Sequence, residues 1–220
     1  MSWWNASRIE LYSRAAEHGD FHRRLGDMLV PLFEGCDDIV ELGCGLGYMT
    51  GELCSRGCNA KGYDEDPMAV DFATGRFPRC TFARRDCYRL DKEADAALAV
   101  FFGRIGQEGS LEALLSSCRR RLVYVCNEHC QWNRCTWKVT ARVRQSLDAR
   151  GVGYECTTGH LRFDQLLEDE DELDVFIREN YESRGRTFDL DIERGTGRYP
   201  IRVVNDKSFG IFTIEKEDAR

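Results

Sequence analysis

The sequence predicts a doubly wound α/β protein built around a mostly parallel sheet. The first observation is a short apolar strand at 38–42 that runs into a turn with glycines at positions 43, 45 and 47. The second is an acid, Asp64, at the end of the next apolar stretch, about 20 residues further on. The third is the alternation of strand-like and helix-like segments that follows. Together they indicate strands joined by right-handed helical crossovers, with a ligand site at the carboxyl ends of the strands.

The elements follow from local patterns taken in chain order. Residues 1–35 have the apolar spacing of a helical cap, which is ended or kinked at Pro31. Pro67 suits the first position of a helix. The run at 96–101 is almost wholly apolar, as expected of a strand that helices cover on both faces. We expect strands at 38–42, 59–63, 81–83, 96–101 and 122–126, and helices at 47–56, 67–75, 110–118 and 136–150.

The C-terminal third departs from this alternation. A strand is expected at 154–161, followed by an acidic helix at 164–180. Two further strands, at 199–204 and 209–215, flank a stretch at 205–208 whose Asn, Asp, Lys and Ser have the composition of a hairpin turn. We therefore expect the chain to end in a β-hairpin rather than in another helical crossover.

Composition bounds the class of protein. A chain of 220 residues with 42% hydrophobic content can bury one core, so we expect a single domain over 1–220. No stretch reads as a signal peptide or a membrane span, and the eleven cysteines are expected to be reduced thiols in the cytoplasm. The net charge of −7 disfavours nucleic acid as the main ligand, because phosphate binding needs a basic face.

The spacing within the glycine turn decides between two classes of nucleoside ligand. A dinucleotide site needs G-x-G-x-x-G, so that a helix N-terminus can face the pyrophosphate. The third glycine of that pattern would fall at Tyr48 or Thr50. The chain instead has G-x-G-x-G preceded by Glu41. The glycines let the backbone approach a ligand, and the carboxylate of Asp64 can accept hydrogen bonds from both ribose hydroxyls.

The segments Glu41-Leu42-Gly43-Cys44-Gly45-Leu46-Gly47 and Gly62-Tyr63-Asp64 resemble the motifs of the class I S-adenosylmethionine-dependent methyltransferases. The resemblance is best over 36–128, the expected cofactor-binding half. It implies a seven-stranded, Rossmann-like sheet whose last strand, at 209–215, is antiparallel. It also implies that the cap at 1–35 precedes this half and that a substrate-side half follows at 129–220.

The same resemblance implies S-adenosyl-L-methionine as the cofactor. In this family the glycine turn passes the methionine part, an acid in the place of Asp64 holds the ribose, and an acid in the place of Asp86 meets the adenine amino group. By this resemblance the cofactor-binding residues are Glu41, Gly43, Cys44, Gly45, Gly47, Asp64, Glu65, Asp86, Cys87 and Phe101.

The acceptor side is expected to suit a small-molecule substrate. Methyltransferases for nucleobase or glutamine amino groups commonly carry an Asn/Asp-Pro-Pro-Tyr/Phe motif after the fourth strand, where this chain has Phe101-Phe102-Gly103-Arg104. In small-molecule members of the family the helical cap folds over the cofactor, although packing of the cap against the sheet would explain its aromatic residues equally well. The substrate-pocket candidates are Trp4, Tyr12, Phe102 and Arg104.

The segment after the fifth strand, 126–135, contains three cysteines and one histidine. Such residues can build a zinc site, but the usual paired Cys-x-x-Cys is missing, so we expect no metal. Glu128 and His129 are the candidates for a general base at the pocket rim. A plain loop after the strand is the simpler interpretation of the segment.

The sequence thus predicts methyl transfer from S-adenosyl-L-methionine to a small molecule by in-line displacement. In such a reaction the protein chiefly aligns the nucleophile and excludes water. Three alternatives stay open: a methyltransferase for RNA or protein, a nicotinamide enzyme, and a non-catalytic protein that binds S-adenosylmethionine.

Overall fold

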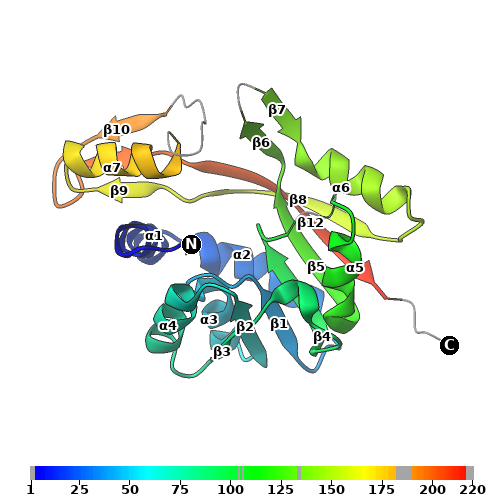
Figure 1. The fold of residues 1–220 in the computed structure, drawn as a ribbon. Helices are drawn as coiled ribbons and strands as arrows, with labels where there is room; N and C mark the ends of the chain where they lie inside the picture. The colour runs from blue at the N-terminus through cyan, green and yellow to red at the C-terminus, as the bar shows by residue number, and fades with distance from the viewer. Residues whose placement is uncertain (1–2, 104, 106, 133–134, 182–189, 217–220) are drawn as a thin grey trace.

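The computed structural model describes residues 3–103, 105, 107–132, 135–181 and 190–216, and its main feature is a seven-stranded sheet (Figure 1). In spatial order its strands are β3 (Thr81–Arg84), β2 (Ala60–Asp64), β1 (Ile39–Leu42), β4 (Ala94–Val100), β5 (Cys118–Asn127), β12 (Asp206–Glu215) and β8 (Glu155–Arg162). β1 to β5 pair in parallel, whereas β12 runs antiparallel to both β5 and β8. This arrangement confirms the expected doubly wound, Rossmann-like sheet with an antiparallel last strand.

The strand order also locates a ligand site. The chain moves outward from β1 to β3 and then returns to place β4 on the other side of β1. At such a reversal the connections leave the two central strands in opposite directions, so the carboxyl ends of β1 and β4 border a crevice.

Helices cover both faces of the sheet. They are α1 (Ala6–His18), α2 (Phe21–Leu29), η1 (Val30–Phe33), α3 (Tyr48–Ser55), α4 (Pro67–Arg76), η2 (Cys87–Arg89), α5 (Ser110–Ser116), α6 (Val139–Asp148) and α7 (Glu170–Asn180). Successive residues of a strand face opposite sides, so Ile39 of β1 joins a core with α2 and α3, whereas Val40 and Leu42 join a core with α5 and α6. Within the described ranges, none of these helices is both long and apolar enough to cross a membrane.

A two-stranded ribbon joins the main sheet to a second sheet made of β9 (Gln165–Leu167), β10 (Ile192–Arg194) and β11 (Ile201–Val203). The pairing of β9 with β11 continues in the same register as the pairing of β8 with β12. Between them, Phe163 N donates to Asn205 O at 2.9 Å. The ribbon, formed by 155–167 and 201–213, is therefore continuous. It carries α7 and β10, here called the insert, to the side of the molecule where α1 lies (Figure 1).

The prediction of a hairpin turn at 205–208 is wrong. β11 and β12 lie in different sheets and do not pair with each other; instead, Lys207 and Ser208 pair with Leu161 and His160 of β8. These cross-strand hydrogen bonds hold turn-forming residues in an extended conformation, so long-range pairing overrides their local preference. For the same reason the helix expected at 164–180 begins only at Glu170, since β9 occupies its first turn.

The prediction of a loop at 126–135 is also wrong. Here the chain forms β6 (His129–Trp132), which pairs antiparallel with β7 (Cys135–Lys138). The helix expected from residue 136 consequently begins at Val139. This hairpin carries the chain away from the end of β5, which matters for the predicted catalytic residues.

The cap helix α1 is hydrogen-bonded to both β9 and α7 in the C-terminal region. Gln165 of β9 donates its Nε2 to the Leu11 carbonyl at 2.9 Å. Arg14 is buried, and its guanidinium contacts Glu172 of α7 at 2.6 Å and Glu10 at 3.0 Å. A buried guanidinium needs such partners, so the cap and the insert depend on each other for their positions.

We predict that Arg14→Ala lowers the free energy of unfolding by about 2 kcal/mol. This is less than for a fully buried pair, because Glu172 and Glu10 keep partial access to water. Urea denaturation measures the effect. The matched control is Arg23→Ala, which removes an exposed ion pair with Asp20 from the cap and should change the free energy by less than about 0.5 kcal/mol. Equal effects of the two substitutions would contradict the role of Arg14.

Candidate functional site

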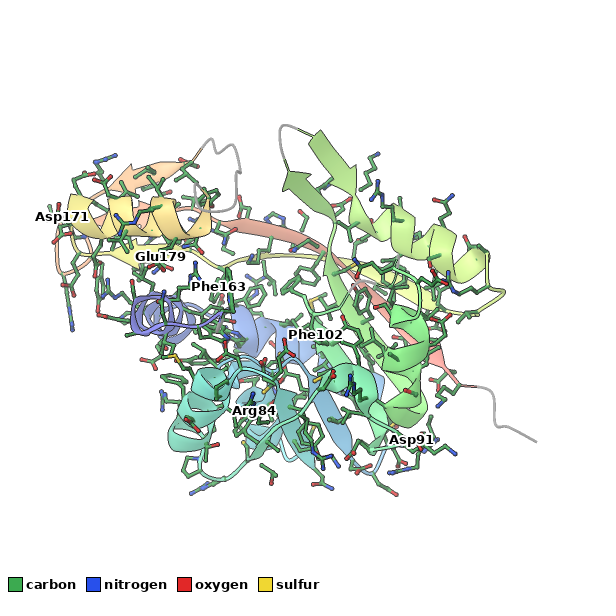
Figure 2. All side chains as sticks on the ribbon, in the orientation of Figure 1. Arg84, Asp91, Phe102, Phe163, Asp171 and Glu179 are labelled. Carbon is green, nitrogen blue, oxygen red and sulfur yellow. The ribbon has the colours of Figure 1, made fainter. Side chains whose placement is uncertain are left out.

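A cavity of about 490 Å³ lies at the carboxyl ends of β1 and β4. The glycine turn forms one side through Gly43 and Gly45, and the cap contributes Tyr12 and His22. The ribbon contributes Phe163, which is labelled in Figure 2. Ligand pockets commonly have volumes of roughly 300–1,000 Å³. The cavity therefore has the size and the position of a ligand site in a doubly wound sheet.

The glycine turn has a backbone that only glycine adopts without strain. Gly43, Gly45 and Gly47 have φ values of +66°, +52° and +78°. A Cβ on Gly43 would lie 2.1 Å from the Phe102 ring, and a Cβ on Gly47 would lie 2.7 Å from the Ala73 Cβ. All three glycines are thus required for conformation, and Gly43 and Gly47 are required for space as well.

Asp64 joins the end of β2 to this turn. One carboxylate oxygen, Oδ2, accepts from Gly45 N, and the other, Oδ1, accepts from Asp66 N, both at 2.9 Å. Asp64 is half-buried and is not among the residues that line the cavity. Each carboxylate oxygen has two lone pairs, so Asp64 can hold the turn and still accept from ligand hydroxyls.

Glu41, at the end of β1, is buried and lines the cavity. Thr50 of α3 donates its hydroxyl to Glu41 Oε2. Burial raises the pKa of the Glu41 carboxyl to about 8, although the hydrogen bond from Thr50 acts in the opposite direction. A cationic ligand beside this carboxyl would favour its ionised form. Thr50 was not predicted as a site residue, because its role depends on the contact between α3 and β1.

The other predicted cofactor residues fall into two groups. Cys44 and Phe101 line the cavity, whereas Gly47, Glu65, Asp86 and Cys87 do not. Glu65 is exposed. Asp86 caps η2 by accepting from Tyr88 N at 3.0 Å.

Cys87 contacts the glycine turn: its sulfur accepts a hydrogen bond from Gly43 N at 3.3 Å. Burial raises the pKa of this thiol to about 12, so it remains protonated at neutral pH and is a poor nucleophile.

The predicted substrate and catalytic residues also divide. Trp4 and Tyr12 line the cavity, whereas Phe102 packs over Gly43 and beside Tyr88, with the two ring centroids 5.6 Å apart. Arg104 lies outside the described residues.

Glu128 and His129 do not line the cavity; His129 is exposed, and its Nδ1 lies 3.9 Å from Glu128 Oε2. Their catalytic role stays a prediction that this geometry does not support. Among the described residues, no three His, Cys, Asp or Glu side chains cluster as metal ligands.

An aromatic wall faces the glycine turn across the cavity. Tyr12 packs against Phe163 with ring centroids 5.0 Å apart, and its hydroxyl lies 3.2 Å from His22 Nε2. His22 stacks on Tyr48 at 5.3 Å, and burial lowers the pKa of its imidazole to about 4. The wall is therefore uncharged at neutral pH. Phe163 and Gln165, which also lines the cavity, were missed because the ribbon brings them in by long-range pairing.

Comparison with known proteins gives similarity in structure alone. No protein-family model matches the chain, and no curated protein matches it significantly in sequence. Magnesium protoporphyrin IX methyltransferase from Synechocystis PCC 6803, solved with bound S-adenosylmethionine, is 16% identical, with a TM-score of 0.56 over 97% of this chain and 85% of its own. A putative methyltransferase from Bacillus halodurans C-125 is 11% identical, with a TM-score of 0.56 over 90% and 99%. A putative RNA methyltransferase from Pyrococcus horikoshii is 10% identical, with a TM-score of 0.55 over 90% and 84%.

The chain has the class I methyltransferase fold. The resemblance seen in the glycine motif is thus confirmed at the level of the whole sheet, including its antiparallel strand β12. In the class I fold of this chain, the glycine turn, Glu41 and Asp64 lie together at the strand reversal.

We predict that Glu41→Gln stabilises the protein increasingly as the pH rises from 5 to 8. In this window the folded state holds a proton on Glu41 that the unfolded state has lost, so the stability of the unaltered protein falls with pH. The fall is at most about 1.4 kcal/mol per pH unit. Glutamine has no proton to lose, and its amide oxygen can still accept from Thr50. Urea denaturation at several pH values measures the difference. Exposed Glu155→Gln is the control, and a pH-independent effect of Glu41→Gln would count against the burial of a neutral carboxyl.

We predict that Gly43→Ala is much more damaging than Gly57→Ala. Both glycines have positive φ, +66° and +86°, so alanine costs about 1 kcal/mol at either site. A Cβ on Gly57 meets nothing within 4 Å, whereas on Gly43 it meets the Phe102 ring. The clash should remove a further ~2 kcal/mol of stability. Thermal unfolding measures both variants, and equal losses would show that Phe102 yields without cost.

Proposed function

We propose that the protein is an S-adenosyl-L-methionine-dependent methyltransferase acting on a small-molecule acceptor. The observation that carries the proposal is the joint position of the glycine turn, Glu41 and Asp64 at the carboxyl ends of β1 and β2, beside a cavity of about 490 Å³. This set of groups suits one ligand that has both a ribose and a cationic amino-acid tail.

The residues present fit that cofactor. Gly43 and Gly45 line the cavity and carry no side chain, so a ligand can approach the backbone of the turn closely. Asp64 has acceptor capacity for ribose hydroxyls. Glu41 lines the cavity and would become a carboxylate beside an ammonium group. When bound, S-adenosylmethionine supplies a methyl group that is already activated, so the protein's task is alignment and exclusion of water.

A nicotinamide dinucleotide is a poorer match. Its pyrophosphate would need the exposed N-terminus of the first helix after β1. In this chain α3 begins at Tyr48, whose buried ring packs against His22 at 5.3 Å and Phe77 at 5.3 Å. A buried aromatic ring therefore stands where a dinucleotide motif counted from Gly43 has its third glycine.

The limited volume of the cavity favours a small acceptor. α1, the ribbon and α7 stand around it, and its volume of about 490 Å³ has to hold the cofactor as well as the acceptor. Gln165 donates through Nε2 to the Leu11 and Leu166 carbonyls. Its Oε1 is the side-chain atom left to accept a hydrogen bond from the molecule that receives the methyl group. The net charge of −7 weighs against a nucleic acid substrate. The nine cysteines whose side chains the structure describes are free thiols, which suits the proposed cytoplasmic location.

Calorimetric titration tests the proposal directly. We expect micromolar binding of S-adenosylmethionine and S-adenosylhomocysteine and no binding of reduced nicotinamide dinucleotides. Absence of sulfur-nucleoside binding by folded protein would refute it. Binding to bulk tRNA with steep salt dependence would instead favour a macromolecular acceptor. Cofactor binding without turnover on broad panels of small molecules, proteins and RNA would favour a non-catalytic binding protein.

We predict that Asp64→Ala weakens S-adenosylmethionine binding by roughly 10- to 150-fold, because a charge-assisted contact worth about 1.5–3 kcal/mol is lost. The matched control is Asp71→Ala, which removes an exposed carboxylate from α4 and should leave the dissociation constant unchanged. Titration calorimetry on protein shown to be folded gives both constants. Unchanged affinity in Asp64→Ala would show that Asp64 does not bind the ribose.

A further inference from the structure

The indole of Trp4 stands at the junction between the glycine turn and the start of α4. The backbone N–H of Trp4 donates a hydrogen bond to Asp66 Oδ2 at 3.1 Å. A Cβ built on Gly45 would lie 3.3 Å from Trp4 Cζ2, 3.9 Å from Cε2 and 4.0 Å from Nε1, so these atoms of the indole lie against the turn. Trp4 also lines the cavity.

The covalent structure of the proposed cofactor indicates what would lie beside this ring. In S-adenosylmethionine the sulfonium joins the ribose to the amino-acid tail. Asp64, the proposed ribose acid, accepts from Gly45 N and Asp66 N, and these are the same two residues that Trp4 contacts. A ligand with its ribose at Asp64 and its tail along Gly43 and Gly45 would therefore place the sulfur close to the Trp4 ring.

The ring is held in place by the cap. Tyr12 packs edge-to-face against Trp4, with ring centroids 5.5 Å apart and an angle of 87° between the ring planes. Tyr12 is itself fixed by Phe163 and by its contact with His22. Cation–π attraction is strongest where the aromatic ring is held in place and the cation is shielded from water.

We propose that Trp4 recognises the sulfonium of bound S-adenosylmethionine and makes the site discriminate between the charged cofactor and its neutral product. The inference rests on the proposed function and adds a specificity-determining residue to it. During transfer the S–CH₃ bond breaks and its electron pair stays on sulfur, while the acceptor gains the methyl group and releases a proton to water. The sulfur is then an uncharged thioether, so the attraction to Trp4 disappears and product release is favoured.

The test compares Trp4→Leu with the unaltered protein in calorimetric titrations. The probes are S-adenosylmethionine, S-adenosylhomocysteine and sinefungin, which carries a positive ammonium group in place of the methylsulfonium. We expect Trp4→Leu to weaken binding of the two cationic probes by roughly 3- to 30-fold and to change binding of S-adenosylhomocysteine by less than about twofold. Trp4→Phe, which keeps an aromatic face, should show a smaller loss with the same selectivity and serves if Trp4→Leu does not fold.

A matched control removes another ring that packs on α1. Tyr199 lies 5.1 Å from His18 by ring centroids and 4.8 Å from the Arg14 guanidinium, and it does not line the cavity. Tyr199→Leu should change the dissociation constants of all three probes by less than about twofold. A selective loss in this variant as well would assign the effect to loosening of the cap and would overturn the inference.

Other outcomes are equally decisive. Equal weakening of all three probes by Trp4→Leu would show that the ring supplies only shape. Tighter binding of all three would show that it obstructs the site. Either result would overturn the role of Trp4 while leaving the proposed cofactor intact. Absence of binding by the unaltered protein would instead refute the proposed function itself.

Discussion

The hydrogen bonds accepted by the Asp64 carboxylate are the interaction on which the arrangement of the site depends. One oxygen accepts from Gly45 N, and the other from Asp66 N. Asp66 in turn accepts from Trp4 N and Met68 N, so it holds the N-terminal segment and caps α4. Two neighbouring carboxylates thus connect the turn after β1, the end of β2, the start of α4 and the cap. Charge-assisted hydrogen bonds of this kind are short and directional, which suits them to fixing a ligand site.

The opposite wall depends on a different constraint, the unbroken register of the ribbon. Because β8 continues into β9 and β11 continues into β12, the second sheet is held to the main sheet by backbone hydrogen bonds. The cap then packs between the two, tied by Gln165 and by the buried Arg14. The cavity is complete only when the sheet, the cap and the insert are all in place, so this wall is a product of tertiary assembly.

Burial sets the electrostatic character of the cavity. It raises the pKa of Glu41 to about 8 and lowers that of His22 to about 4, so both groups are largely neutral at pH 7. In such surroundings the positive charge of a sulfonium or ammonium group interacts strongly with the few groups that favour it. The neutral aromatic wall explains why alignment and charge recognition, rather than a strong base, are the properties that these residues offer.

The sequence by itself determined the strand–turn–strand unit from Ile39 to Asp64, because short apolar strands, positive-φ glycines and helix starts are local properties of the chain. It therefore predicted the fold class and located Glu41, the glycine turn and Asp64. Tertiary structure decided the rest. Residues 205–208 have turn composition but are extended by pairing with β8, and the β6–β7 hairpin carries the chain after β5 away from the cavity, so Glu128 and His129 do not reach it. Phe163 and Gln165 enter the site through strand partners about 40 residues away, and no local pattern encodes such pairing.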